Sequence, residues 1–439
     1  MKKFWILLSF SNFLIAALFG LILRAAFVWE IDWMEYRNLL HAHSHVAMLG
    51  WVYMGIYALF YSRFLPEPKR KSYSSLFWLT QITVIGMMLS FPLQGYAAVS
   101  ISFSSLHILA SYVFCFRIWK DQQISHPAVK KMLGASLVFL ILSTLGVWVL
   151  GPLAVSGGRN TALYQIAIQF YLHFQFHGWF TFAILALLLD TMLRRNWKIK
   201  EHLFARFFTV FVVATFLTFG LVLYWAYGNT SFWWLNNLGL LLQLIGLGLF
   251  LQMGWEGLRN QLNSRENLAF RFGFLSWIIK IGIQTLVIFP EAAASATTIR
   301  PLMMGFIHLT VLGIVSAFMI YFFSTLGYFR TKSNPFMLAL TLFVSGFVFT
   351  EILLFTQGLF YWWHLGQLPF YHESLFALST LLPLAILLFI LHINTKKTPM
   401  NKIKEAKKYL QPNTTTYEKS DPNQNANHRP SFLFLWIRK

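Results

Sequence analysis

Long apolar stretches, separated by short polar segments, run along most of the chain. A bilayer core about 30 Å thick is crossed by about 20 apolar helical residues, and the pattern predicts twelve such spans. They lie near residues 4–28, 39–62, 74–96, 99–119, 132–152, 162–190, 203–227, 232–256, 272–290, 301–325, 335–361 and 371–393. No stretch alternates with the period of two that is typical of membrane barrels. We therefore expect an all-α membrane protein.

The composition changes after residue 393. Residues 394–439 are rich in Lys, Asn, Pro, Thr and Gln, a composition typical of disorder. We expect a twelve-helix transmembrane domain over residues 1–393 and a basic, mostly disordered cytoplasmic tail over residues 394–439. The first span follows two lysines but is longer than the apolar part of a signal peptide, so we expect it to be retained. No internal repeat is evident.

The basic residues predict the orientation of the spans. With the N-terminus inside, 30 of the 35 Lys and Arg residues fall in inner segments, and only Arg24, Arg37, Arg159 and Arg300 fall outside. Cytoplasmic loops of membrane proteins carry such an excess. We therefore expect both termini in the cytoplasm and location in the inner (plasma) membrane of the cell. The net charge of +20 is then explained by contact with lipid headgroups rather than nucleic acid.

Overall composition agrees with this prediction and removes several kinds of site. The chain is 57% hydrophobic and 11% charged, whereas soluble domains carry about 25% charged residues. Its single cysteine, Cys115, excludes an internal disulfide framework, a thiolate metal cluster and covalent haem attachment through a C-x-x-C-H motif.

Histidines are the main candidates for chemistry because they lie in the predicted spans. Three occur at the outer end of span two, two in span six and one in span ten: His41, His43, His45, His173, His177 and His308. Residues four apart share a helix face, so His41 pairs with His45 and His173 with His177, while His43 faces elsewhere. Imidazole pairs bind metals, and single histidines on different helices bind haem iron axially. The alternative is hydrogen bonding between helices, which we favour for the lone His107.

These segments resemble subunit I of the haem–copper oxidases, nearest the nitric oxide reductase and cbb3-type branch. The resemblance rests on YRNLLHAHSHVAMLGW in span two, LHFQFHGWF in span six and GFIHLTVLG in span ten. The H-A-H of span two is also similar to the NnrS family. The resemblance implies an oxidase-like bundle of twelve helices that binds haem, b-type by analogy. It also implies an oxidoreductase in respiratory electron transfer or in oxygen or nitric oxide handling, with a cytochrome or other respiratory subunits as partners.

The resemblance implies roles for individual histidines. The histidines of span two (His41, His43, His45) and His308 correspond to haem ligands, and His173 and His177 to ligands of a second metal. The family places two further histidines in span seven, where this chain has only His202 at the inner edge, and Phe306 stands at the first position of the H-x-H in span ten. Copper or another second metal therefore stays open, and no catalytic residue is assigned.

Two charged residues, Lys280 and Glu351, fall near the middle of spans nine and eleven. Charges there are costly and usually paired or functional. We expect them to approach each other, as an ion pair or a proton relay. The alternative functions remain a twelve-span secondary transporter that uses these two residues for coupling, and a metal-handling protein that uses the histidine pairs.

Overall fold

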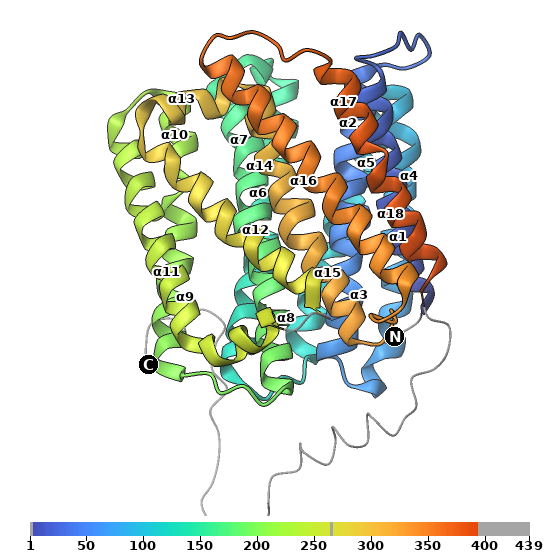
Figure 1. Ribbon diagram of the computed structural model, residues 1–439, viewed down its shortest axis with the longest axis vertical. Coiled ribbons are helices and arrows are strands. Elements are labelled where there is room, and N and C mark those ends of the chain that lie inside the picture. Colours follow the sequence, from blue (N-terminus) through green and yellow to red (C-terminus); the bar gives the residue numbers. More distant parts are fainter. Residues whose placement is uncertain (1–2, 264–266, 394–439) are drawn as a thin grey trace, which may run out of the picture. The chain divides into compact units, whose positions relative to one another are not determined.

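The computed structural model describes residues 3–263 and 267–393, and in this part all regular structure is helical (Figure 1). The helices are α1 (Lys3–Ala25), α2 (Tyr36–His45), η1 (Val46–Tyr53), α3 (Met54–Phe64), η2 (Glu67–Ser72), α4 (Tyr73–Gln94), α5 (Ala98–Asp121), α6 (Pro127–Val155), η3 (Gly158–Asn160), α7 (Ala162–His173), η4 (Phe174–Phe180), α8 (Thr181–Arg194), α9 (Glu201–Leu217), α10 (Gly220–Tyr227), α11 (Thr230–Asn263), α12 (Leu268–Thr285), η6 (Leu286–Ile288), α13 (Pro290–Thr298), α14 (Arg300–His308), η7 (Leu309–Ser316), α15 (Ala317–Thr325), α16 (Asn334–Trp362), α17 (Tyr371–Ser379) and α18 (Leu381–Leu391). The predicted tail lies outside the described residues.

Within the described residues, eleven helices are long and apolar enough to cross a membrane. This confirms an all-α, multi-pass membrane protein. The remaining predicted span, 39–62, is also continuous helix, since Val46 and Met54 join α2, η1 and α3 with helical dihedral angles. It is less apolar than the others because it carries three histidines and three tyrosines. Residues 54–61 are all buried, so most of α3 is shielded by its neighbours and does not need a lipid-compatible surface.

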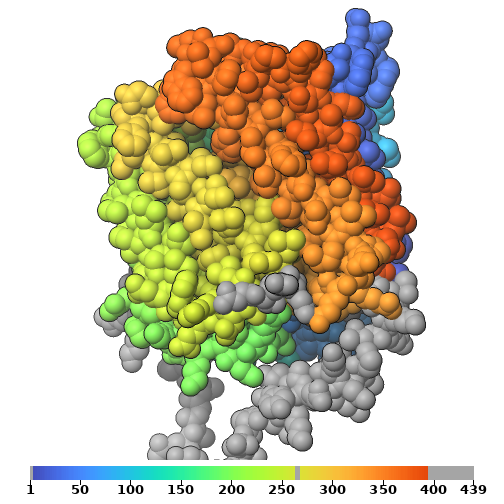
Figure 2. Space-filling model, in the orientation of Figure 1, coloured from blue at the N-terminus to red at the C-terminus, as the bar shows by residue number. Residues whose placement is uncertain are grey.

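The helices divide into inner and outer ones. The most apolar windows of residues 162–194 and 300–325 are 83% and 78% buried, whereas those of the other nine are 33–50% buried. Together with residues 36–64, these are the three segments that carry most of the candidate histidines. On the face seen in Figure 2, side chains of α12 and α16 form much of the surface. The histidines therefore lie on helices that the outer spans cover.

Each inner helix contains a π-helical segment that begins directly after a histidine. In the described ranges, π-helix occurs as η1 after His45, η4 after His173 and η7 after His308. All three follow the pattern H-x4-G, in HVAMLG, HFQFHG and HLTVLG. π-Helical turns are rare and are frequently found at functional sites.

The glycine of each motif faces the span that precedes it. A Cβ atom at Gly178 would meet Phe139 of α6 at 2.6 Å. One at Gly50 would meet Asn12 of α1 at 3.1 Å as well as Val84 of α4 at 2.9 Å, and one at Gly313 would meet Ser276 of α12 and Phe347 of α16, both at 3.0 Å. Small residues allow membrane helices to approach closely. The same position in all three inner helices is therefore a point of close helix packing.

The bundle is consequently built from three related groups of helices, although no repeat is evident in the sequence. In each group an outer span (α1, α6 or α12) packs on the π segment of the next span, and a further pair (α4 with α5, α9 with α11, α16 with α18) completes the group. Only short motifs survive at matching positions, because lipid-facing residues need to be apolar but need not be any particular apolar residue.

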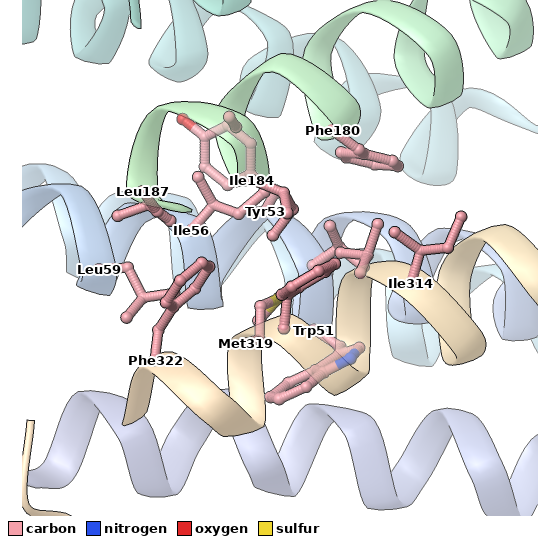
Figure 3. Packing of buried hydrophobic residues seen from close by; sticks show 14 of the residues in the cluster. Trp51, Tyr53, Ile56, Leu59, Phe180, Ile184, Leu187, Ile314, Met319 and Phe322 are labelled. Carbon is pink, nitrogen blue, oxygen red and sulfur yellow. The ribbon is translucent and has the colours of Figure 1, made fainter. Parts of the chain in front are cut away.

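Apolar packing joins the three inner helices along half of their length. We call the end of the bundle where α1 begins the basic end (lower in Figure 1) and the opposite end the far end. Toward the basic end, α3, α8 and α15 contact one another, and Figure 3 shows Ile56, Ile184 and Phe322 among the side chains that meet there. At that end Arg63 donates to Thr325 Oγ1 at 2.8 Å and lies 3.8 Å from Asp190 Oδ2, so it links all three helices.

Substitution of Gly178 by leucine tests the packing of the π segments. The new side chain would collide with the Phe139 ring, and overpacking of this kind costs about 1–3 kcal/mol. We expect a clearly lower unfolding temperature in detergent. Gly248→Leu is the matched control, because a Cβ atom at Gly248 meets nothing within 4 Å. Equal effects of the two substitutions would contradict the close packing proposed for η4.

Candidate functional site

Toward the far end the inner helices no longer pack closely on one another, and a cavity of about 410 Å³ lies beside two of them. It is bounded by α1, α2 with η1, α14 with η7, and the helices α16–α18, and most of its lining side chains are apolar. His43 and His308 both line it. The structure thus brings one histidine of span two and the histidine of span ten to one cavity.

Packing and a hydrogen bond hold the His43 ring in place. Its Nδ1 atom lies 2.8 Å from the carbonyl oxygen of Ala16 in α1. Since a carbonyl only accepts, Nδ1 carries the hydrogen, and Nε2 of the neutral ring keeps a free lone pair. A Cβ atom at Gly20 would lie 2.8 Å from Cε1 of the ring. Glycine at position 20 therefore makes room for His43 against α1.

The second histidine has a carboxylate beside it. His308 Nδ1 lies 3.6 Å from Glu351 Oε1 of α16, and a Cβ atom at Gly305 would lie 3.1 Å from Glu351 Oε2. Neither carboxylate oxygen of Glu351 has a hydrogen-bond partner, although the side chain is only 9% exposed. An imidazole whose Nδ1 side faces a carboxylate presents Nε2 elsewhere, which is the usual arrangement around metal-bound histidines.

Positive charge gathers at the far end of the cavity. Arg24 and Arg300 line this part. Arg24 donates to the Leu375 carbonyl oxygen at 3.4 Å and to the Ser379 hydroxyl, which connects α1 to α17. The Arg300 guanidinium lies 6.0 Å from the centre of the Tyr36 ring. The cavity therefore combines apolar walls, two imidazoles and a cationic end, which suits an amphipathic, anionic cofactor.

The histidines predicted to bind a second metal are occupied by other contacts. His173 Nε2 donates to the Thr215 carbonyl oxygen at 2.8 Å. This carbonyl also accepts from Thr218 Oγ1 at 3.3 Å, whereas the backbone N–H of Phe219 bonds to Phe216, because span seven is interrupted between α9 and α10. His177 Nδ1 accepts from Lys280 Nζ at 2.8 Å. In the described ranges no group of three or more His, Cys, Asp or Glu residues is arranged to hold a metal ion.

The predicted pairing of Lys280 with Glu351 is wrong, because each side chain has other partners. Lys280 donates to His177 and to Gln284 Oε1, the latter at 2.5 Å, and lies 5.7 Å from the centre of the Phe306 ring. Glu351 lies beside His308 instead. Both side chains are buried, but each belongs to a different cluster, because His308 and Phe306, two residues apart on α14, point to different sides of that helix.

His41 and His45 form a third cluster, on the other side of α2 from His43. Both rings lie against Tyr96, with centres 4.6 and 5.8 Å away, and the His45 ring also lies 4.3 Å from Phe91. His45 Nδ1 donates to the His41 carbonyl oxygen at 2.8 Å. The spacing argument thus separated His43 from the other two correctly, without indicating which side faces a cavity.

His107 lies apart from these clusters and bonds to Thr83. The distance from its Nδ1 atom to Thr83 Oγ1 is 3.0 Å. This contact joins α5 to α4, in agreement with the structural role expected from the sequence.

Sequence reasoning missed Gly20 and the two cavity arginines. A signal for the arginines was present: Arg24 and Arg300 are two of the only four basic residues that fall on the predicted outer side. Basic residues on the outer side are exceptions to the excess of Lys and Arg in cytoplasmic segments, and both of these arginines line the cavity. Gly20 has no such signal, because its importance depends on the position of the His43 ring.

No protein-family model matches the chain, and a search of curated proteins finds no match.

Proposed function

We propose that the protein binds one b-type haem between spans two and ten, with His43 and His308 as the axial ligands, and that it takes part in membrane electron transfer. The observation that carries the proposal is the shared cavity: two histidines from helices far apart in sequence line one largely apolar space. Haem b needs an apolar pocket with one or two axial side chains and no covalent attachment.

The residues present fit such a group in three respects. Nδ1 of each ring faces an oxygen atom, of Ala16 or of Glu351, which leaves Nε2 for iron. The two arginines at the far end suit the carboxylates of haem propionates. Glu351 has no hydrogen-bond donor, and the Nδ1–H of an iron-bound His308 would supply one.

His43 and His308 would hold the haem, which would supply one-electron transfer when bound. The surrounding side chains have the tasks of excluding water and fixing the imidazoles. Trp51 of η1, whose Nε1 donates to Ser316 Oγ of η7 at 2.7 Å, ties together the two helices that carry the ligands. This contact would keep the separation between the two histidines constant during electron transfer.

A second metal centre of the kind found in haem–copper oxidases is not supported. The resemblance would place it near span six, where His173 bonds to the backbone and Lys280 bonds to His177. The Phe306 ring lies 6.2 Å from that of His177, centre to centre. We therefore propose a divergent relative of subunit I that has twelve spans, both termini in the cytoplasm and no oxygen-reducing centre. Its partners would be cytochromes or other respiratory subunits of the plasma membrane.

The transporter and metal-handling alternatives have less support. Coupling through Lys280 and Glu351 would require one shared site, and these residues have separate partners. Metal handling would require three or four ligands at one point, and in the described part of the chain no group of three or more His, Cys, Asp or Glu residues is arranged to hold a metal ion.

The haem ligands are tested by alanine substitution and visible spectroscopy of the purified protein. We expect wild-type protein to show a Soret band and, after reduction with dithionite, the α band of b-type haem. His43→Ala and His308→Ala should each lose most of this absorbance, because each removes an axial ligand.

The matched control is His45→Ala, two residues from His43 but in the cluster with Tyr96. It should keep the spectrum. If His45→Ala loses haem and His43→Ala retains it, the ligand assignment is wrong. If the wild-type protein has no Soret band after expression with added haem precursor, the haem proposal fails and the transporter becomes the better hypothesis.

Metal analysis tests the absence of a second centre. We expect iron equal to the haem content, copper well below one atom per haem, and no oxygen consumption with an artificial reductant. The physical reason is the shortage of ligands, since tight protein sites use about three or four. Copper bound at one atom per haem, together with oxygen reduction, would contradict this proposal and indicate an active oxidase.

Gly20→Leu tests the packing of the His43 ring against α1 without removing a ligand. The added side chain would displace the imidazole ring, and disturbed ligand orientation typically weakens metal binding roughly 10- to 100-fold. We expect a matching loss of haem on dilution or competition with apomyoglobin. Gly282→Leu, where a Cβ atom meets nothing within 4 Å, is the control. Unchanged haem retention in Gly20→Leu would argue against His43 as a ligand.

A further inference from the structure

A second hollow lies at the basic end of the bundle, away from all the histidine clusters. It is an open groove of about 530 Å³ between η2 and the last turns of α5. Its lining consists of Lys69, Ser72, Tyr112, Val113, Phe116, Arg117, Lys120 and Asp121. Charged residues and apolar residues thus share one surface feature.

One end of the groove is cationic. Lys69, Arg117 and Lys120 contribute three positive charges and Asp121 one negative charge. Asp121 is already engaged, since Lys69 Nζ lies 3.3 Å from Oδ1 and the Tyr73 hydroxyl donates to Oδ2 at 3.2 Å. Arg117 donates to the Ser72 carbonyl oxygen at 2.8 Å, which holds its guanidinium against η2. Lys120 is exposed, so the groove has spare positive charge for an anion.

The other end of the groove is apolar and continues along α5 toward the middle of the bundle. Phe116 lies one helical turn before Lys120, and Val113 lies one turn before Arg117. These two apolar side chains are 65% and 42% exposed. Tyr112 bounds the apolar end, and its hydroxyl is fixed by Thr144 and by Trp148 Nε1, at 2.5 and 2.8 Å.

We propose that this groove binds an anionic phospholipid. The phosphate would lie against Lys69, Arg117 and Lys120, and an acyl chain would follow Val113 and Phe116. Basic pockets beside membrane helices bind anionic headgroups, and an exposed apolar surface on a membrane-spanning helix is normally covered by lipid. A soluble phosphate compound would use the cationic end only. The proposal does not depend on haem; the proposed orientation serves only to place the groove in the cytoplasmic leaflet.

Native mass spectrometry of the full-length protein tests the proposal. The protein is purified in mild detergent with an equimolar mixture of phosphatidylglycerol and phosphatidylcholine. We expect wild-type protein to retain phosphatidylglycerol preferentially. The double substitution Lys69→Gln with Lys120→Gln should weaken this binding about 30-fold, since each interfacial lysine contributes about fivefold.

The matched control is Lys198→Gln with Lys200→Gln, which removes the same charge from exposed lysines of the segment between α8 and α9. It should retain phosphatidylglycerol like the wild type. Equal losses in the two double variants, or no preference over phosphatidylcholine, would overturn the proposal. Lys120→Gln alone, which leaves the contact between Lys69 and Asp121 intact, should show a several-fold loss even if the double variant folds poorly.

A competition experiment distinguishes lipid from soluble phosphate. Glycerol phosphate carries the headgroup charge without acyl chains, so it should not displace phosphatidylglycerol at equal concentration. Phe116→Ser should weaken lipid binding while leaving any binding of glycerol phosphate unchanged. Displacement by glycerol phosphate, or full lipid binding by Phe116→Ser, would show that the groove is a soluble-anion site and would overturn the lipid proposal.

Discussion

The arrangement of this protein depends on the contact between three π-helical segments and the spans that precede them. At Gly50, Gly178 and Gly313 an inner helix approaches its outer neighbour too closely for a side chain. Two of the segments also carry a hydroxyl that compensates the altered backbone, because Thr181 and Ser316 each donate to the carbonyl five residues earlier. π-Helical turns change the direction of a helix. The inner helices can therefore pack together toward the basic end and separate toward the far end.

The side chains around the three groups of inner histidines differ. Between spans two and ten the space stays open and holds His43 and His308. Beside span six, Lys280 and Phe306 occupy the space around His177. Beside α4, Tyr96 and Phe91 surround the remaining histidines. The three groups of histidines therefore differ in a few neighbouring side chains, and of these histidines His43 and His308 line the cavity.

The partners of the charged residues differ between the basic end and the interior of the bundle. At the basic end arginine and lysine have acidic partners, as in the links from Arg63 to Asp190 and from Lys69 to Asp121. Inside the bundle Arg24 has backbone and hydroxyl partners. Desolvated charges are costly, and Glu351, which has no hydrogen bond, lies beside the His308 ring.

The sequence by itself determined the helical class, the approximate limits of the spans and the division of the span-two histidines between two helix faces. These properties follow from hydropathy and helical periodicity, which are local. Only the tertiary structure decided that His43 shares a cavity with His308, that Lys280 contacts His177 rather than Glu351, and that His173 donates to the carbonyl of Thr215. Those pairings depend on the rotation and bending of helices far apart in the chain, and rotation of an inner helix leaves no trace in hydropathy because all its faces are covered.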